Sequence, residues 1–166
     1  DLITTAKGLT NGVIPMGAVL VSDDIYQAFM QGPEQSIELF HGYTYSGHPV
    51  AAAAGLATLD VYQEEGSFAQ SRELETMFAE AIHQFDDHPL VIDVRNFGLM
   101  GAIELAPRQD APGARGLDAH KHCFWDEDLV IRNGMDILQF SPFLNSKPAD
   151  IHSMFDSVRR VLDKIT

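Results

Sequence analysis

The segment LITTAKGLTNG, residues 2–12, decides how this sequence is interpreted. Leu2 to Ala6 are apolar residues and threonines, a composition typical of a β-strand. Lys7 follows directly, and the next five residues form a turn-rich loop whose two glycines allow unusual backbone angles. The segment therefore predicts a strand that places a lysine at the start of a loop.

Lys7 is a candidate for covalent chemistry with a carbonyl group. It alone among the four lysines follows an apolar strand, whereas Lys121, Lys147 and Lys164 lie in polar contexts. Binding sites in open α/β sheets form at the carboxyl ends of strands, and a lysine among apolar neighbours can lose its proton and attack an aldehyde. By composition alone a solvated, non-catalytic lysine is the commoner case, so both interpretations stand at this point.

Strands and helices alternate after this segment. Residues 18–21 are all apolar and predict a buried strand, and Ser22 predicts the cap of a short helix that ends near Met30. Pro49 suits the first position of a helix and predicts one that runs to about Gln63. That helix is apolar around most of its girth, which predicts burial on several sides.

The second half of the sequence predicts a mixed arrangement of helices and strands. Apolar residues spaced by three and one predict an amphipathic helix after Ser67, and a similar stripe predicts the last helix after Pro148. The predicted elements are helices at 67–85, 118–125 and 148–165, strands at 91–95, 99–105, 129–132 and 137–140, and a loop at 107–117. We expect residues 1–66 to finish an α/β domain and residues 67–166 to form a smaller α+β domain.

Composition and charge restrict the partners and the compartment. Apolar residues make up 45% of the chain, as in folded soluble proteins, and no apolar run approaches the roughly 20 residues that span a bilayer. The formal net charge of −13 repels phosphate backbones and anionic lipids, so we expect neither nucleic acid nor membrane as a partner. The single cysteine, Cys123, excludes an internal disulfide framework and agrees with a cytoplasmic location.

Residues 41–50, HGYTYSGHPV, are dense in small, aromatic and hydroxyl residues and end where a helix is predicted to begin. The loops before helices attract anions, including phosphate. Tyr43 and Thr44 are therefore candidates for an anion contact, with a plain connecting loop as the alternative.

Two pairs of histidines raise the question of a metal site. His41 and His48 have no carboxylate or cysteine at ligand spacing. His120 and His122 are two residues apart and would diverge on a helix. We therefore expect no metal site.

Arg132 follows the apolar residues 129–131, and a strand there would carry its guanidinium toward an interior or a cleft. The planar guanidinium binds carboxylates at two points. The competing interpretation is that Arg132 forms a structural ion pair with one of the 24 acidic residues. The same structural interpretation applies to Arg95.

Together these motifs resemble the class III (omega) aminotransferases, within the fold-type I pyridoxal-phosphate enzymes. The resemblance rests on residues 6–12 with 14–19, on 41–50, and further along on 96–101 and 139–143. Within the family the beta-alanine–pyruvate branch is the most similar, partly through residues 145–148. The resemblance implies an α/β fold, the end of the large domain plus the small α+β domain. The start at Asp1, without methionine and inside a strand, agrees with a C-terminal fragment.

The resemblance also implies a role for each candidate residue. Lys7 matches the lysine that binds the aldehyde of pyridoxal 5'-phosphate and then moves the substrate proton. Tyr43 and Thr44 match a pair that reaches across a dimer interface to the phosphate of the neighbouring subunit's cofactor, which implies a homodimer or a higher homo-oligomer. Arg132 matches the arginine that grips the substrate carboxylate and swings aside for amines without one.

The implied reaction moves an amino group from an amine or a beta/omega-amino acid to pyruvate or a similar keto acid. In this family the phosphate-cradling loop, the ring-stacking aromatic and the aspartate at the pyridine nitrogen lie upstream of the lysine, outside these residues. We therefore expect the chain alone to be inactive. Two alternatives stay open: an aminomutase or decarboxylase of the same fold, and a non-catalytic acidic interaction domain.

Overall fold

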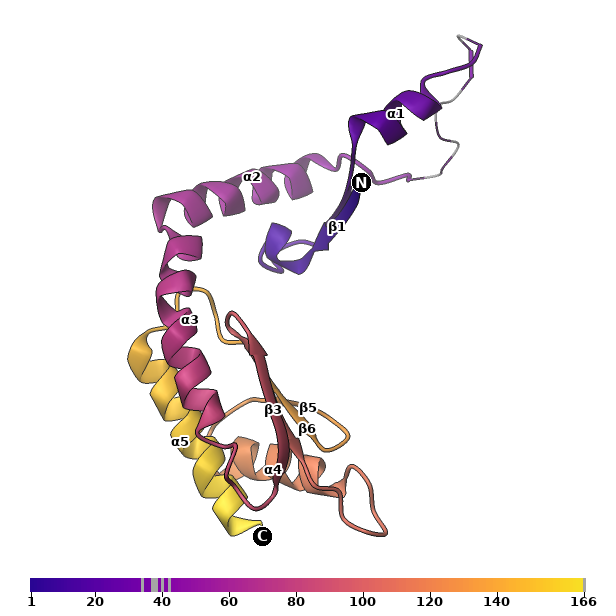
Figure 1. Ribbon diagram of the computed structural model, residues 1–166. Helices are drawn as coiled ribbons and strands as arrows, with labels where there is room; N and C mark the ends of the chain where they lie inside the picture. The colour runs from indigo at the N-terminus through magenta and orange to yellow at the C-terminus, as the bar shows by residue number, and fades with distance from the viewer. Residues whose placement is uncertain (34, 37–38, 40, 42, 166) are drawn as a thin grey trace. The chain divides into compact units, whose positions relative to one another are not determined.

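The computed structural model describes residues 1–33, 35–36, 39, 41 and 43–165. The chain divides into two compact units, Asp1–Gly66 and Ser67–Thr166, which we call unit 1 and unit 2 (Figure 1). Within the described residues, none of the helices combines the length and the apolar character that a membrane crossing requires.

The described residues of unit 1 form a two-stranded sheet and two α-helices (Figure 1). Its elements are β1 (Leu2–Ala6), the 3-10 helix η1 (Lys7–Leu9), β2 (Gly17–Val21), α1 (Asp23–Phe29) and α2 (Pro49–Glu64). The strands are antiparallel, with Leu2 opposite Val21 and Ala6 opposite Gly17. The strand that ends just before Lys7 and the helix that begins at Pro49 confirm the sequence predictions.

Unit 1 leaves most of its apolar side chains exposed, which differs from the predicted burial. The strand at 18–21 is present, but Val19, Leu20 and Val21 expose 57%, 53% and 46% of their surface. The three residues buried in α2 are Ala51, Gly55 and Thr58. A two-stranded sheet offers few neighbours, so these residues are apolar without having a layer to pack against in this unit.

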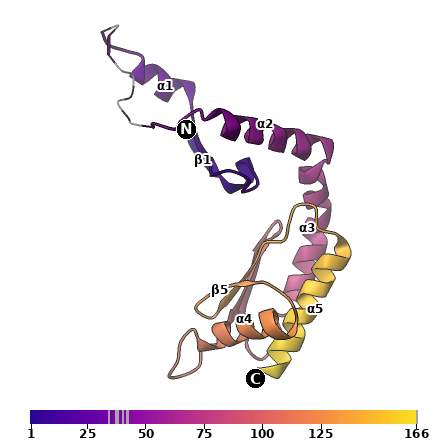
Figure 2. The ribbon, with the colours of Figure 1, turned by 180° about the vertical axis from the view of Figure 1, so that it is seen from behind.

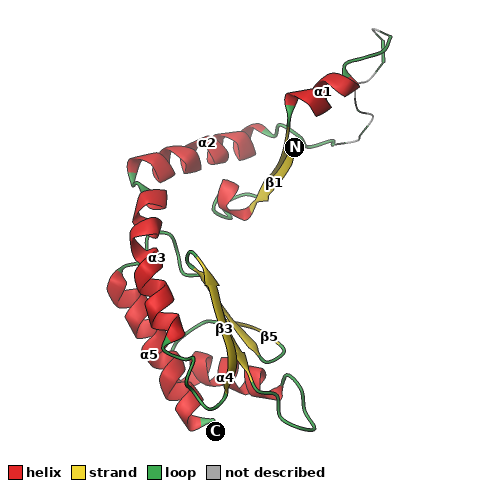
Figure 3. Ribbon diagram, viewed as in Figure 1, coloured by secondary structure: helices red, strands yellow, loops and turns green. Residues whose placement is uncertain are grey.

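Unit 2 contains a sheet and three helices (Figure 3). The sheet is antiparallel, with strand order β3-β4-β6-β5. Its elements are α3 (Ser67–His83), β3 (Val91–Phe97), β4 (Met100–Leu105), α4 (Ala114–Asp126), β5 (Arg132–Gly134), β6 (Ile137–Phe140) and α5 (Pro148–Lys164). Helices α3 and α5 lie side by side in both views (Figures 1 and 2). Both were predicted from the spacing of their apolar residues.

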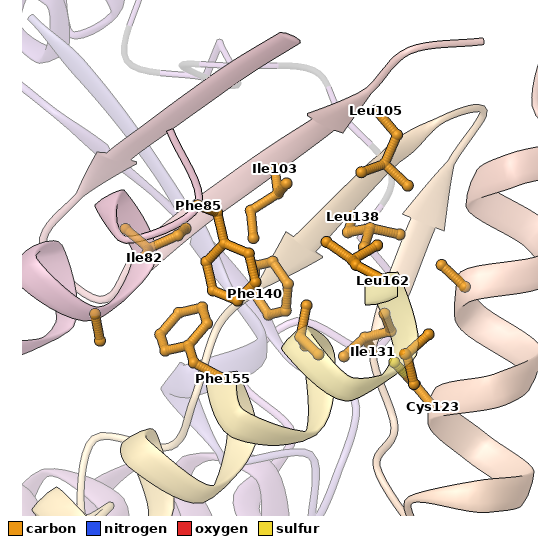
Figure 4. Packing of buried hydrophobic residues seen from close by; sticks show 14 of the residues in the cluster. Ile82, Phe85, Ile103, Leu105, Cys123, Ile131, Leu138, Phe140, Phe155 and Leu162 are labelled. Atoms are coloured by element: carbon orange, nitrogen blue, oxygen red, sulfur yellow. The ribbon is translucent and has the colours of Figure 1, made fainter. Parts of the chain in front are cut away.

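The core of unit 2 lies between one face of the sheet and the three helices (Figure 4). On β4 and β6 the buried residues alternate with less buried ones, as expected when only one face is covered. The buried residues of these strands are Ile103, Leu105, Leu138 and Phe140. Phe155 on α5 lies at the centre of an aromatic group, with ring centroids 5.4 Å from Phe78, 6.0 Å from Phe85 and 5.2 Å from Phe140.

Helix α4 begins earlier than predicted. The glycine- and proline-rich loop predicted a start at Asp118, but the helix begins at Ala114. The cause is a distant cap, because the Asp136 carboxylate accepts the backbone N–H of Gly113 at 2.6 Å and that of Gly116 at 2.9 Å. These N–H groups at a helix start have no partner within the helix. The cap comes from 20 or more residues further along the chain, so the local pattern does not contain it.

Strand β5 also differs from its prediction. Residues 129–131 were predicted to form a strand with Arg132 at its end, whereas the observed strand starts at Arg132 and ends at Gly134. The reason is a side-chain bond, since Nδ1 of His120 on α4 lies 2.8 Å from the carbonyl oxygen of Ile131. That carbonyl contacts a helix and is not used in a strand pair.

Candidate functional site

Lys7 lies directly after β1, as the first residue of η1. Its φ angle is 52°, in the left-handed region that costs a non-glycine residue about 1–2 kcal/mol. The side chain is exposed, and its Nζ has no hydrogen-bond or ion-pair partner among the described residues. Strained backbone of this kind concentrates at functional sites, so the conformation of Lys7 adds a physical signal that composition lacked.

The loop after Lys7 is held by a residue that the sequence did not identify as functional. The hydroxyl of Tyr62, on α2, donates to the carbonyl oxygen of Gly8 at 2.7 Å and lies 3.3 Å from Oδ1 of Asn11. Inside the loop, the buried Thr10 donates its hydroxyl to the carbonyl oxygen of Ile14 at 2.6 Å. Because Tyr62 lies 54 residues from Gly8, no local signal could have found it.

Tyr43 and Thr44 line a pocket of about 780 Å³. Its other walls come from residues 14–17 and from the first turns of α2, including Ala51. Thr44 and Ser46, whose side chains carry hydroxyl groups, are among its lining residues. The two predicted anion-contact residues therefore share one concave surface that carries hydroxyl donors.

Lys7 does not line this pocket, but it lies close along the sheet. Gly17 is a wall residue and pairs with Ala6, the residue before Lys7. Helix α2 touches both regions, since a Cβ added at Gly55 would lie 3.5 Å from the Met16 sulfur, in the pocket wall, and 3.7 Å from the carbonyl oxygen of Leu9 in η1. The β1–β2 pair and helix α2 thus contact both the segment of Lys7 and the Tyr43–Thr44 pocket.

Arg132 projects from the face of the unit 2 sheet that the helices leave uncovered. It pairs with Gln139, and the residues on either side of Gln139, Leu138 and Phe140, are buried against the helices. Side chains alternate along a strand, so Gln139 and its partner point the other way. Arg132 is exposed, and its guanidinium forms no hydrogen bond or ion pair with a described residue.

Arg95 lies in the same row of the sheet but is fully engaged. The register joins Arg95 to Ala102, Ala102 to Gln139 and Gln139 to Arg132. The two arginines are therefore three strand spacings apart, about 14 Å.

Arg95 forms ion pairs with two acidic residues. Its Nη1 contacts the carboxylate of Asp93 and, at 3.0 Å, that of Glu104. These hydrogen bonds, with Asp93 first, raise the pKa of Arg95. Arg95 therefore belongs to structural ion pairs within the sheet, whereas the guanidinium of Arg132 is available for a carboxylate from outside the chain.

The remaining titratable candidates have structural partners. His120 bonds to the carbonyl oxygen of Ile131, whereas His122 lies 2.7 Å from the Asp126 carboxylate, so the two rings diverge. Among the described residues no three side chains of His, Cys, Asp or Glu gather as a metal site would require. Cys123 is buried, and burial raises the pKa of its thiol to about 12, which makes it unreactive.

The fold and these groups define a class, and a family comparison agrees with it. The model of the class-III aminotransferases matches residues 1–162 of the 166, and the chain belongs to this family. Over 99% of its length it is 50% identical to an omega-aminotransferase of Caulobacter vibrioides and 44% identical to a beta-alanine–pyruvate aminotransferase of Pseudomonas aeruginosa. The chain spans about 37% of the length of these relatives.

Solved structures agree with the sequence comparison. A transaminase determined with L-alanine superposes with a TM-score of 0.91 at 28% identity, over 99% of this chain and 40% of the other. An amine transaminase from an uncultivated Pseudomonas species, in its pyridoxal-phosphate-bound form, gives 0.89 at 27% identity, over 100% of this chain and 39% of the other. The predicted family and the predicted fold-type I α/β fold class are confirmed.

The residues present fit the cofactor that this family uses. An aldehyde requires a primary amine without a competing partner, and Nζ of Lys7 has none among the described residues. A phosphate requires hydroxyl or N–H donors, and the pocket of Tyr43 and Thr44 offers hydroxyls ahead of helix α2. Pyridoxal phosphate therefore suits the donor set, although its aldehyde and its phosphate suit two separate places on this chain.

Proposed function

We propose that this chain is the C-terminal part of a pyridoxal-phosphate-dependent aminotransferase. The enzyme would move an amino group from an amine or a beta/omega-amino acid to pyruvate or a similar keto acid. The omega-aminotransferase and beta-alanine–pyruvate aminotransferase relatives support this choice. The observation that carries it is Lys7, an unpaired amine on strained backbone at the end of a strand.

Lys7 has two tasks in this proposal. Pyridoxal phosphate, when bound, supplies an electron sink for the carbon next to the amino nitrogen. Lys7 binds the aldehyde through Nζ in the resting enzyme. As a free amine during turnover, Nζ of Lys7 would serve as the base that takes the proton from the substrate carbon and as the acid that gives it back. The left-handed backbone at Lys7 and the bonds of Tyr62 to the following loop fix the place from which that amine acts.

Tyr43 and Thr44 contact the phosphate of a cofactor bound to a neighbouring subunit. Lys7 is not among the residues that line their pocket, which supports a contact in trans, with the aldehyde at Lys7 and the phosphate in this pocket belonging to different copies of the cofactor. The functional protein is then a homodimer or a higher homo-oligomer.

Arg132 binds the carboxylate of the keto acid and of amino-acid donors. Its exposed guanidinium has no acidic partner among the described residues, although the chain carries 24 acidic residues. A free planar guanidinium binds a carboxylate at two points and can also turn aside for amines without one. By contrast, the engaged Arg95 is unavailable for this task.

Each unit has a place in the larger enzyme. Unit 1 is the end of the large cofactor-binding domain, and unit 2 is the small C-terminal α+β domain. The share of the relatives that the chain covers, about 37%, supports a chain that is part of a larger enzyme. We propose a cytoplasmic location, in keeping with a single buried thiol.

The test is covalent trapping at Lys7 in the intact protein. After incubation with pyridoxal phosphate and reduction with borohydride, mass spectrometry of peptides should find the cofactor on Lys7. Lys7→Ala should remove the label and lower the formation of alanine from pyruvate by about a thousandfold, the range expected for loss of a general base and covalent anchor. Lys121→Ala, an exposed lysine on α4, is the matched control and should change neither.

Two outcomes would redirect the proposal. Labelling of other lysines with none on Lys7 would refute a cofactor role for this residue and favour a non-catalytic domain. Trapping at Lys7 with release of carbon dioxide, or with rearranged amino acid and no alanine, would point to a decarboxylase or an aminomutase of the same fold.

A further inference from the structure

Arg132 begins a short strand at the edge of the unit 2 sheet. β5 has three residues and pairs only with β6 among the described strands. Its three pairs are Arg132–Gln139, Asn133–Leu138 and Gly134–Ile137. A strand this short is fixed by few ladder bonds, so the position of Arg132 depends on what holds the two ends of the segment.

The first end is held by His120 on α4. Nδ1 of His120 lies 2.8 Å from the carbonyl oxygen of Ile131, the residue before Arg132. A carbonyl oxygen only accepts, so Nδ1 carries the hydrogen. Ile131 itself is buried in the core at 5% exposure. The bond therefore ties the backbone just ahead of Arg132 to a helix that is packed on the sheet.

The second end is held by Asp136, at the close of the β5–β6 turn. Its buried carboxylate accepts the N–H groups of Gly113 and Gly116 at the start of α4. The approach is close, because a Cβ added at Gly116 would lie 2.1 Å from the carbonyl oxygen of Met135. Met135 in turn has a left-handed φ of 56°. Only a glycine at 116 lets the helix meet this turn.

We infer that His120 and Asp136 are positioning residues for Arg132. Helix α4 holds the segment at residues 131 and 136, so the strand that carries the guanidinium cannot slide or tilt along the sheet edge. The binding of a substrate carboxylate then depends on α4, although neither His120 nor Asp136 touches that carboxylate. This inference rests on the proposed function of Arg132.

The experiment compares variants of the intact protein supplied with pyridoxal phosphate. The KM for pyruvate and the single-turnover rate of the half-reaction with isopropylamine, a donor without a carboxylate, are measured for each variant. Arg132→Ala tests the proposed function, and His120→Ala tests the inference. We expect His120→Ala to raise the KM for pyruvate about tenfold, the effect of one lost hydrogen bond at a positioning site. The isopropylamine half-reaction, which does not use the guanidinium, should stay within about twofold.

Two further variants separate positioning from general damage. His120→Asn places an amide nitrogen near the position of Nδ1 and should restore most of the pyruvate KM. His122→Ala removes a histidine two residues away on the same helix that bonds to Asp126, and should leave both values unchanged. Hydrogen–deuterium exchange of residues 131–134 should be faster in His120→Ala and return to normal in His120→Asn.

The possible failures are distinguishable. If Arg132→Ala leaves the pyruvate KM unchanged, the proposed function of Arg132 is wrong and the inference falls with it. If Arg132→Ala raises that KM but His120→Ala does not, the proposed function survives and the inference is refuted. An equal loss in both half-reactions for His120→Ala, without rescue by His120→Asn, would also refute it, since it would show a structural defect only.

Discussion

The two units of this chain differ in how far their apolar side chains are buried. Unit 2 gathers nineteen buried hydrophobic residues into one cluster between its sheet and its helices. Among the described residues of unit 1, Ala51 is the one buried hydrophobic residue, and both strands expose apolar side chains. The strands of both units are rich in apolar residues, so composition alone does not distinguish the unit with a core from the unit without one.

The difference separates a unit that completes its own core from one that offers surfaces to other parts of an enzyme. Apolar patches that stay exposed mark places where another surface packs. We propose that the exposed faces of β2 and α2 are covered in an enzyme of the relatives' length. Lys7, Tyr43 and Thr44 all lie in this unit, so the proposed cofactor contacts are on the part that depends most on its surroundings.

The largest expected effect on the free energy of unfolding comes from truncating one large apolar side chain in each unit of the 166-residue chain. Phe155→Ala removes a ring that contacts three other aromatic rings in the core and should lower the free energy of unfolding by about 3–5 kcal/mol. Leu20→Ala, on exposed β2, should change it by no more than about 0.5 kcal/mol. Urea unfolding followed by circular dichroism measures both values.

The rate of alkylation of Cys123 measures the unfolding of unit 2 independently of unit 1. Its thiol is buried and has a pKa of about 12, so it should react slowly until the unit opens. Phe155→Ala should bring the onset of labelling to lower urea concentrations, and Leu20→Ala should not. If Leu20→Ala proved as costly as Phe155→Ala, the apolar face of unit 1 would be packed in this chain and the contrast between the units would be wrong.

A smaller effect is expected where α5 meets the end of α3. Arg159 donates from Nη2 to the carbonyl oxygen of Gln84 at 2.7 Å, and its guanidinium lies 4.4 Å from the centroid of the Phe85 ring. Arg159→Ala should cost about 1 kcal/mol, measured by the same urea unfolding. Arg72→Ala, an exposed arginine of α3 without a partner among the described residues, controls for the lost charge. Equal effects would show that charge, not contact, is what the first variant removes.

Helices and strands whose physical cause lies in neighbouring residues could be predicted from the sequence. The strand before Lys7 follows from threonines and aliphatic residues, and the helix at Pro49 from a proline whose missing N–H is harmless at a first position. The buried face of α5 follows from the spacing of its apolar residues. In each case the physical cause lies within one turn or one strand, so the printed order of residues contains it.

Features with distant causes could not be predicted in this way. The start of α4 depends on Asp136, the start of β5 on His120, and the loop after Lys7 on Tyr62. The contrast between Arg95 and Arg132 depends on which carboxylates the sheet register brings near. The candidate residues were therefore found from local motifs, but the contacts that hold them in place were not.

The smallest expected effect concerns the pH dependence of unit 2. Both carboxylate oxygens of Glu127, just after α4, accept from Arg160 on α5, the shortest contact being 2.6 Å to Nη2. These bonds lower the pKa of Glu127. A carboxyl whose pKa is lowered by folding stabilises the folded state above its unfolded pKa and loses that contribution as the pH falls through its folded pKa. The pair should therefore contribute at neutral pH and not in acid.

Glu127→Gln keeps the shape of the side chain and removes its charge. The difference in unfolding free energy between this variant and the unchanged chain should be largest near neutral pH, shrink below the usual carboxyl range, and decrease with added salt, because exposed charges are screened. Glu75→Gln, an exposed glutamate of α3 without a partner among the described residues, should show no such trend. A difference that stayed constant into acid would mean that packing of the side chain, and not its charge, joins α4 to α5.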